Sequence, residues 1–227
     1  MKRFTGLIPI FLLLGITACT SGDASDSTAK AQATCKKLLG PAGVDWLDGR
    51  TGGDGGLHMG SDNDLKSARS LFYGSVKQWD FTSTEIPNFG LHEVCRVRLD
   101  VKDPAKQLDI QFNPSIFPFD TDFTENSVTR VAPQVTSISR NVRLVHGEDR
   151  SGKTRYRVYV KCKIPGSPAR QANDIPIEGQ LTDTLTGETS PRVLFTHLLH
   201  SAKVVAEEFG CTNKPAIPDT PPASVTG

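Results

Sequence analysis

The chain has 227 residues, of which 37% are hydrophobic and 22% charged, the composition of a globular protein rather than a disordered or fibrous one. Its 26 basic and 25 acidic residues give a formal net charge of +1, and so near-neutral a balance predicts no nucleic-acid partner. The length suits one domain with one hydrophobic core.

The N-terminus has the three parts of an export signal. Two basic residues, Lys2 and Arg3, precede an apolar run at 7–16 that is too short to span a bilayer as a helix. The sequence Ile-Thr-Ala-Cys that ends at Cys19 resembles the lipobox of bacterial lipoproteins. This resemblance implies a signal peptide at residues 1–18 and a diacylglyceryl thioether on Cys19. The alternative is a plain secretory signal with Cys19 as an ordinary thiol.

Acyl chains on Cys19 would hold the protein at the cell membrane without a spanning segment, because each buried methylene group contributes about 0.8 kcal/mol to membrane partitioning. Residues 19–33 are almost all small or polar, which predicts a flexible tether. Residues 212–227 contain four prolines and almost no apolar residues, which predicts a disordered tail. We therefore expect a single extracytoplasmic domain at residues 34–211.

Four further cysteines lie in the expected domain, and an even number in an exported chain predicts two disulfide bonds. Of the three possible pairings we favour the one that joins neighbours along the chain: Cys35 with Cys95, and Cys162 with Cys211. Each bond would join a helix end to a strand in its own half of the chain. A zinc site is the alternative, but zinc ligands usually come in close pairs and these cysteines lie dozens of residues apart.

The first elements of the domain are predicted to be helices separated by a loop. Residues 34–39 predict a helix that ends at Gly40 and Pro41, since glycine ends helices and proline cannot continue one. Residues 49–60 contain six glycines and predict a loop. Apolar residues at near-helical spacing then predict a helix over 64–79.

Alternation of apolar and polar residues predicts the strands. It runs over 94–102, continues over 108–112 after a turn, and returns over 141–145 and 155–164. In residues 113–126 the apolar side chains recur at neither helical nor strand spacing, which predicts a loop.

The last element is the clearest helix. Ser190 as N-cap and Pro191 in the first turn precede an apolar stripe at helical spacing, and Gly210 ends it. Strand pairs joined by short turns and flanked by helices indicate an α+β domain. We expect an antiparallel sheet with helices packed on one face and two disulfides.

Residues 147–154, Gly-Glu-Asp-Arg-Ser-Gly-Lys-Thr, match the phosphate-binding pattern GxxxxGK[ST]. A phosphate loop needs a helix directly after it, so that backbone N–H groups and the helix dipole meet the phosphates. An alternating strand follows here instead. We therefore predict a polar hairpin turn and no cofactor.

Two other groups of residues could hold a metal ion. His197 and His200 lie three apart on the last helix, but a helical wheel places both opposite its apolar stripe, which predicts solvated histidines. The acidic pairs within 62–64 and 120–122 could supply calcium ligands, but neither continues into an EF-hand loop. Helix caps and turns explain them better, and we predict no metal site.

A sharper hypothesis concerns the solvent faces of two predicted strands. They carry basic side chains around one aromatic ring: Arg96, Arg98, Arg155, Arg157, Tyr159, Lys161 and Lys163. If the two strands are close in the sheet, these residues form a patch that could hold anionic lipid head groups or an anionic wall polymer by charge-assisted hydrogen bonds. The alternative is an ordinary solvated face with acidic neighbours such as Asp100 and Asp109.

The whole layout resembles actinobacterial envelope lipoproteins of unknown function. It combines the lipobox, a polar stretch, a Cys-x-x-Leu-Leu opening, a Val-Tyr-Val-Lys-Cys strand and a closing helix that ends in Gly-Cys. The resemblance implies a lipid-anchored protein on the extracytoplasmic face of the cell membrane and transfers no catalytic residues. We expect a non-catalytic binding or sensing module. The alternatives are a structural envelope protein that engages another protein and a hydrolase with a dispersed site.

Overall fold

The structure is a computed structural model that describes residues 22–53, 56–61, 63–83, 85–86, 88–90, 92–123, 132–149 and 151–225, with the side chains of its first helix described from Thr28 onward. Within these residues, seven strands form one antiparallel sheet in the order β1-β2-β3-β7-β6-β5-β4. The strands are β1 (His58–Gly60), β2 (Glu93–Arg98), β3 (Gln107–Pro114), β4 (Gln134–Ser139), β5 (Val142–Glu148), β6 (Thr154–Val160) and β7 (Ile177–Asp183). The helices are α1 (Gly22–Thr51), α2 (Leu65–Gln78), α3 (Gln171–Asp174) and α4 (Pro191–Phe209).

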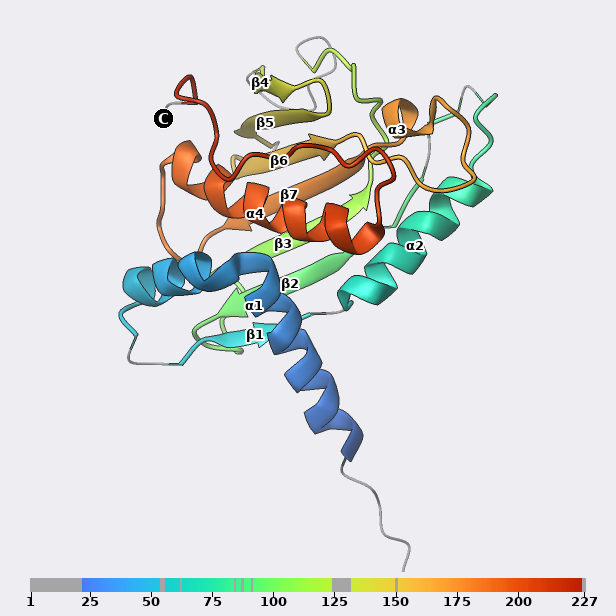
Figure 1. The fold of residues 1–227 in the computed structure, drawn as a ribbon. Coiled ribbons are helices and arrows are strands. Elements are labelled where there is room, and N and C mark those ends of the chain that lie inside the picture. Colours follow the sequence, from blue (N-terminus) through green and yellow to red (C-terminus); the bar gives the residue numbers. More distant parts are fainter. Residues whose placement is uncertain are drawn as a thin grey trace, which may run out of the picture.

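Figure 1 shows α1, α2 and α4 on the same face of the sheet, which we call the covered face. The main hydrophobic core lies between that face and these helices. Every second residue of a strand enters it, so that Leu108, Ile110 and Phe112 of β3 are at most 1% exposed. The predicted α+β fold, an antiparallel sheet with helices on one face, is confirmed.

Helix α4 has the boundaries that its sequence predicts. Ser190 is the N-cap, Pro191 stands in the first turn, and Gly210 ends the helix in the left-handed conformation with φ 66°. The predicted helix over 64–79 is also present as α2, whose first turn is capped by Asp64 through the backbone N–H of Ser67 at 2.7 Å.

Strand β7 was not predicted, and it lies between β3 and β6 in the centre of the sheet. Its core-facing residues include Gly179, which leaves room for an aromatic ring of the neighbouring strand. A Cβ atom at this position would lie 2.4 Å from Cε1 of Phe112 and 2.8 Å from Cγ1 of Val158. The glycine is therefore required by packing, and it also interrupts the apolar alternation that would have predicted the strand.

The expectation of a flexible tether over 19–33 is wrong for its described part, because α1 begins at Gly22. Alanines at every second position from 29 to 33 favour the helix. The first helical segment ends at Gly40, as predicted, with non-helical φ 66° and ψ 173°, and Pro41 starts a second segment that continues to Thr51. The expected loop over 49–60 accordingly holds the end of α1 and the strand β1.

The expectation of a disordered tail over 212–227 is wrong for residues 212–225. Figure 1 shows this segment (red) running back along α4. Val225 is 3% exposed and Ile217 packs against the main core. The side chain of Asn213 accepts a hydrogen bond from the backbone N–H of Lys163 at 2.9 Å. Few apolar residues suffice here because the tail covers an existing core instead of forming its own.

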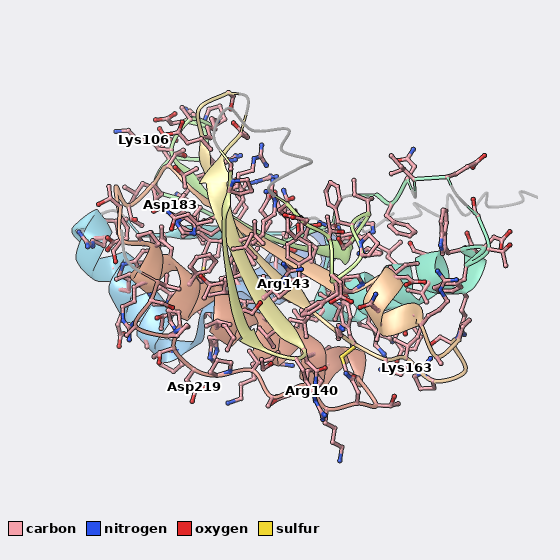
Figure 2. The ribbon with its side chains drawn as sticks, turned by 90° about the horizontal axis from the view of Figure 1, so that it is seen from above. Lys106, Arg140, Arg143, Lys163, Asp183 and Asp219 are labelled. Atoms are coloured by element: carbon pink, nitrogen blue, oxygen red, sulfur yellow. A yellow bond between two sulfur atoms is a disulfide. The ribbon has the colours of Figure 1, made fainter. Side chains whose placement is uncertain are left out.

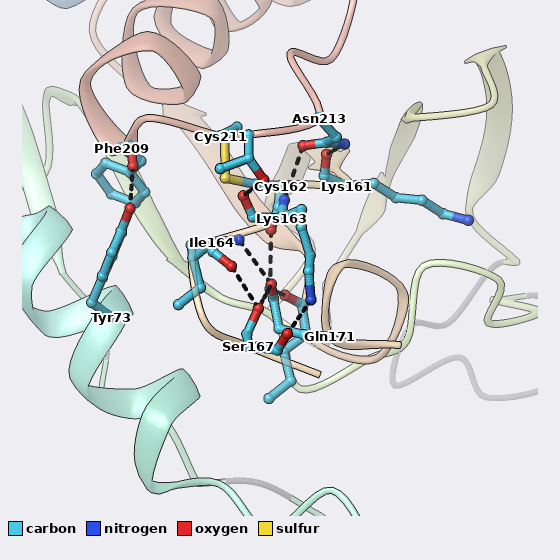
Figure 3. The surroundings of a disulfide bond; sticks show 12 residues. Tyr73, Lys161, Cys162, Lys163, Ile164, Ser167, Gln171, Phe209, Cys211 and Asn213 are labelled. Atoms are coloured by element: carbon cyan, nitrogen blue, oxygen red, sulfur yellow. Dashed lines mark hydrogen bonds between the residues drawn. A yellow bond between two sulfur atoms is a disulfide. The ribbon is translucent and has the colours of Figure 1, made fainter. Parts of the chain in front are cut away.

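The disulfides join Cys35 to Cys95 and Cys162 to Cys211, as predicted. The first bond ties α1 to β2, and the second ties the segment after β6 to the residue that follows Gly210. Figure 3 shows the second bond above the buried side chain of Gln171, whose amide donates to the carbonyl of Cys162 at 3.0 Å. With all four cysteines paired, the zinc alternative is excluded.

None of the described helices is long and apolar enough to cross a membrane.

Candidate functional site

The face of the sheet opposite the helices, which we call the polar face, carries half-buried polar side chains from four adjacent strands. These are Arg96 and Arg98 of β2, Gln107, Asp109 and Gln111 of β3, Glu178, Gln180 and Thr182 of β7, and Arg155 and Arg157 of β6. The strand register sets them in rows across the sheet. In one row Arg96 lies opposite Asp109, and Asp109 opposite Thr182; in the next, Gln111 lies opposite Gln180, and Gln180 opposite Arg157.

The strand order separates the two pairs of arginines that the sequence placed in one patch. Strands β3 and β7 lie between β2 and β6. Three inter-strand spacings of about 4.8 Å put Arg96 and Arg98 roughly 14 Å from Arg155 and Arg157. The arginines therefore form two groups, one near the β1 edge of the sheet and one near its middle.

Three of the four arginines on β2 and β6 pair with carboxylates of the described residues. Arg96 pairs with Glu93 and, at 3.3 Å, with Asp109. Burial raises the pKa of the Asp109 carboxyl, and the charge of Arg96 partly opposes this rise. The middle group is paired in the same way, as Arg155 lies 2.7 Å from Asp149 and Arg157 lies 3.3 Å from Glu178.

Arg98 differs from the other three. Its Nε and Nη2 donate hydrogen bonds of 2.8 and 2.5 Å to the amide oxygen of Gln107, which is neutral. The amide of Gln107 in turn donates to Asp109 at 2.6 Å. The guanidinium of Arg98 is thus held in place by an uncharged group.

Tyr159 was expected on a solvated face, and that expectation is wrong. It points to the same side as Arg157 but is 1% exposed, because residues 115–123 cross over it. We call these residues the strap. Phe119 and Phe123 of the strap pack on Tyr159 and Val145 in a second, smaller hydrophobic cluster.

The strap is fixed to the sheet by polar contacts. Arg143 of β5 donates hydrogen bonds to the carbonyls of Phe119 and, at 3.2 Å, of Thr121. Under the strap, Glu178 accepts a hydrogen bond from the hydroxyl of Ser115 at 3.2 Å. Burial raises the pKa of the Glu178 carboxyl against the opposing charge of Arg157. The strap thus closes one end of the polar face over the half-buried side chain of Glu178.

The two lysines of the predicted patch lie apart from the arginines. Lys161 places its ammonium 4.5 Å from the ring centre of Phe119 and 3.7 Å from Asp120. Because β6 ends at Val160, the alternation does not continue to Lys163. Figure 3 shows Lys163 pointing toward Ser167, whose carbonyl it contacts at 2.5 Å.

The expectation that both histidines of the last helix are solvated is wrong for His197. Its side chain is 8% exposed and stacks on Trp46 with ring centres 4.3 Å apart. Burial, followed by the charge of His200, lowers the pKa of this imidazole. The ring of His200 lies against Gly40, where a Cβ would come within 2.6 Å of its Nε2. The helical-wheel prediction is wrong for His197 because α1 and its kink cover this side of α4.

No group of three or more metal-binding side chains is found among the described residues. Asp64 caps α2 and Asp120 lies beside Lys161, whereas Asp62 is outside the described part of the chain. Strands β5 and β6, which hold the first and last residues of the stretch 147–154, pair as a hairpin, as predicted, and Gly152 has φ 78°.

Two of the cavities that the described residues form lie beside the sheet, and each is lined by both polar and apolar side chains. One, of about 340 Å³, is lined by Lys153, Tyr156, Asp183, Glu188 and neighbouring residues at the start of α4. The other, of about 350 Å³, lies where α1 passes β1 and β2, and we call it the edge pocket. Its lining comprises Thr28, Gln32, Leu57, His58, Met59, Gly60, Arg96, Arg98 and Val101.

The edge pocket could not be identified from the sequence. Thr28 and Gln32 fall in the stretch that predicts a tether, and His58 falls in the glycine-rich stretch that predicts a loop. The alanines on either side of Gln32 are the one local signal for the helix that brings these residues to β2.

Two observations bear on the other function classes. No histidine side chain in the described part of the chain is hydrogen-bonded to a serine or a carboxylate, which is the arrangement that a dispersed hydrolase site would show. The large apolar side chains exposed on the described surface come from four separate segments: Leu71, Ile86, Val101 and Ile116.

The chain matches no family model, no curated protein and no solved structure.

Proposed function

We propose that this protein is an extracytoplasmic binding module, held at the cell membrane by a lipid on Cys19, and that its polar face binds anionic envelope material. The observation that supports this proposal most is the uncovered face itself. It presents four half-buried arginines on β2 and β6, of which Arg98 is held by an amide and the other three by carboxylates. A guanidinium can donate two parallel hydrogen bonds to a phosphate or carboxylate.

Two further observations support the proposal. The two disulfides fit an oxidising compartment outside the cytoplasm. The cavities of about 350 and 340 Å³ combine polar and apolar side chains, as ligand-binding sites do, whereas a structural role would call for a flat apolar surface.

The anchor is tested by following lipid incorporation. Cells that express the full chain and a Cys19→Ala variant are grown with labelled palmitate, and the protein is partitioned between detergent and aqueous phases. We expect label and detergent partitioning for the native chain and neither for the variant, because the thioether needs the cysteine sulfur. Label on the Cys19→Ala chain would contradict the anchor.

Binding is tested with an unlipidated protein that begins at residue 19, carries Cys19→Ser and is exported so that both disulfides form. Every residue of the main core lies between Cys35 and Val225, so this protein keeps the whole core. We expect it to sediment with phosphatidylglycerol vesicles or with purified anionic wall polymer, and less so as salt is raised. Sedimentation no greater than with neutral phosphatidylcholine vesicles would contradict the proposed function.

A further inference from the structure

The edge pocket combines cationic, polar and apolar groups at the rim of the sheet. His58 of β1 pairs with Arg98 of β2 in the strand register, and Gln32 of α1 lies across the cavity from the strands. Val101, in the turn after β2, also lines the pocket and is 57% exposed, a large fraction for a valine. The pocket therefore suits a ligand with an anionic head and an apolar neighbour.

Arg98 gives the pocket its capacity for an anion. Arg96, on the same strand, is neutralised by Glu93 and Asp109. Arg98 is instead oriented by the neutral side chain of Gln107 and makes no direct ion pair among the described contacts, although its charge also acts on the nearby Asp109 carboxyl. A phosphate group in the pocket would pair directly with this guanidinium, whose rotamer is already fixed.

The pocket lies close to the expected anchor. Figure 1 shows the N-terminal part of α1 (dark blue) extending past β1, away from the rest of the domain. From Gly22 to Thr28 the helix rises about 9 Å, at 1.5 Å per residue. The three residues from Cys19 to Gly22 span at most about 10 Å. A pocket residue thus lies within about 20 Å of the acylated sulfur, near the lipid head groups.

We propose that the edge pocket binds the phosphate group of an anionic phospholipid in the membrane that anchors the protein, with Arg98 as its principal contact. This inference rests on the proposed function and names the ligand and its site. The bound phosphate accepts hydrogen bonds from the Arg98 guanidinium, and Val101 lies at the apolar part of the lipid. Lipid in the pocket would fix the orientation of the domain against the membrane, which one flexible anchor cannot do.

The test uses the unlipidated protein described above, so that the anchor does not mask the pocket. Arg98→Gln should lower its affinity for phosphatidylglycerol vesicles about tenfold, because a charge-assisted contact is lost. Arg98→Lys should give an intermediate loss, since lysine keeps the charge but not the paired donors. The thermal unfolding midpoint of both variants shows that the fold is kept.

Arg140→Gln is the matched control for net charge. Arg140 is exposed and lies in the turn between β4 and β5, at the opposite edge of the sheet from the pocket. Figure 2 shows it at the other end of the molecule from Lys106, which is adjacent to the Gln107 that holds Arg98. We expect less than a twofold change for this control. Unchanged binding by Arg98→Gln, or an equal loss in Arg140→Gln, would overturn the inference.

Two further arms separate the possible sources of the phosphate. Soluble glycerol phosphate should compete poorly with vesicles for the pocket. If glycerol phosphate at the same phosphate concentration displaces the vesicles, the pocket binds a small soluble ligand, and the inference that it binds a lipid is overturned. Binding to wall polymer that depends on Arg98, without binding to vesicles, would overturn it as well.

A double variant, Arg155→Gln with Arg157→Gln, separates this inference from the proposed function. If this variant loses vesicle binding and Arg98→Gln does not, the edge pocket is not the lipid-binding site, while the polar face keeps its proposed role. If the native protein binds neither anionic material, both proposals fail together.

Discussion

The covered face and the polar face are made by the same strands, yet they hold the structure in different ways. On β3, Ile110 points to the covered face and is fully buried, while its neighbours Asp109 and Gln111 point to the polar face and are half-buried. The covered face buries most of the apolar surface and joins three helices to the sheet. The polar face has rows of charges and one small apolar cluster under the strap. Stability should therefore depend mainly on one face, and binding on the other.

The largest expected effect compares one phenylalanine from each face. Phe195 of α4 is fully buried and packs edge-on against Tyr156, whereas Phe123 of the strap is 8% exposed. We expect Phe195→Ala to lower the free energy of unfolding by about 3–5 kcal/mol, through lost burial and a cavity. Phe123→Ala should cost about 2 kcal/mol, since a surface strap can move inward. Urea unfolding measures both, and equal losses would contradict the comparison.

A second prediction concerns the disulfides, both of which tie the covering elements to the sheet. The Cys35–Cys95 bond joins positions 60 residues apart. Replacing both cysteines by serine should lower the free energy of unfolding by about 4 kcal/mol, because the unfolded chain regains the entropy of that loop. Hydrogen exchange should show faster opening of α1 and β2 than of the strap. Faster exchange confined to the strap would count against the division between the faces.

The smallest expected effect lies on the polar face and depends on pH. Burial raises the pKa of Glu178 above its usual value of 4.5, so the folded protein holds this proton more tightly than the unfolded chain does. Stability from this group is therefore present at low pH and is lost as pH rises through the folded pKa. Glu178→Gln removes that dependence.

Urea unfolding of the native protein and of Glu178→Gln between pH 4 and 7 provides the measurement. As pH rises, the free energy of unfolding of the native protein should fall relative to that of the variant. A difference that grows in favour of the native protein would show that the pairing of Glu178 with Arg157 outweighs the cost of burial.

Local signals predicted the elements whose determinants lie within a few residues. α4 has a cap, a first-turn proline and a terminal glycine, and the alternation of β6 is unbroken. The disulfide pairing followed from the helix and strand ends on which the cysteines lie. In β7 the core position is taken by Gly179, which makes room for the ring of Phe112, a contact that no local pattern reveals.

The candidate site could not be predicted from the sequence, because its arrangement depends on features that only the tertiary structure determines. The separation of Arg98 from Arg157 follows from the insertion of β7 between β3 and β6, a choice made by long-range pairing. Tyr159 has the alternation of a solvated residue, and it is buried because an apolar strap returns over it. The edge pocket needs Gln32 of α1 beside Arg98, two segments far apart in the sequence.

The Cys35–Cys95 bond has a consequence for recognition as well as for folding. Gln32 lies one helical turn before Cys35, and Arg96 directly follows Cys95, so the bond joins the helical wall of the edge pocket to its strand wall. The entropy of bringing these walls together is lost once, during oxidative folding. A ligand that arrives later meets a pocket of fixed width, and its affinity is not reduced by the ordering of two separate segments. Chemical reduction should loosen the pocket before it unfolds the sheet.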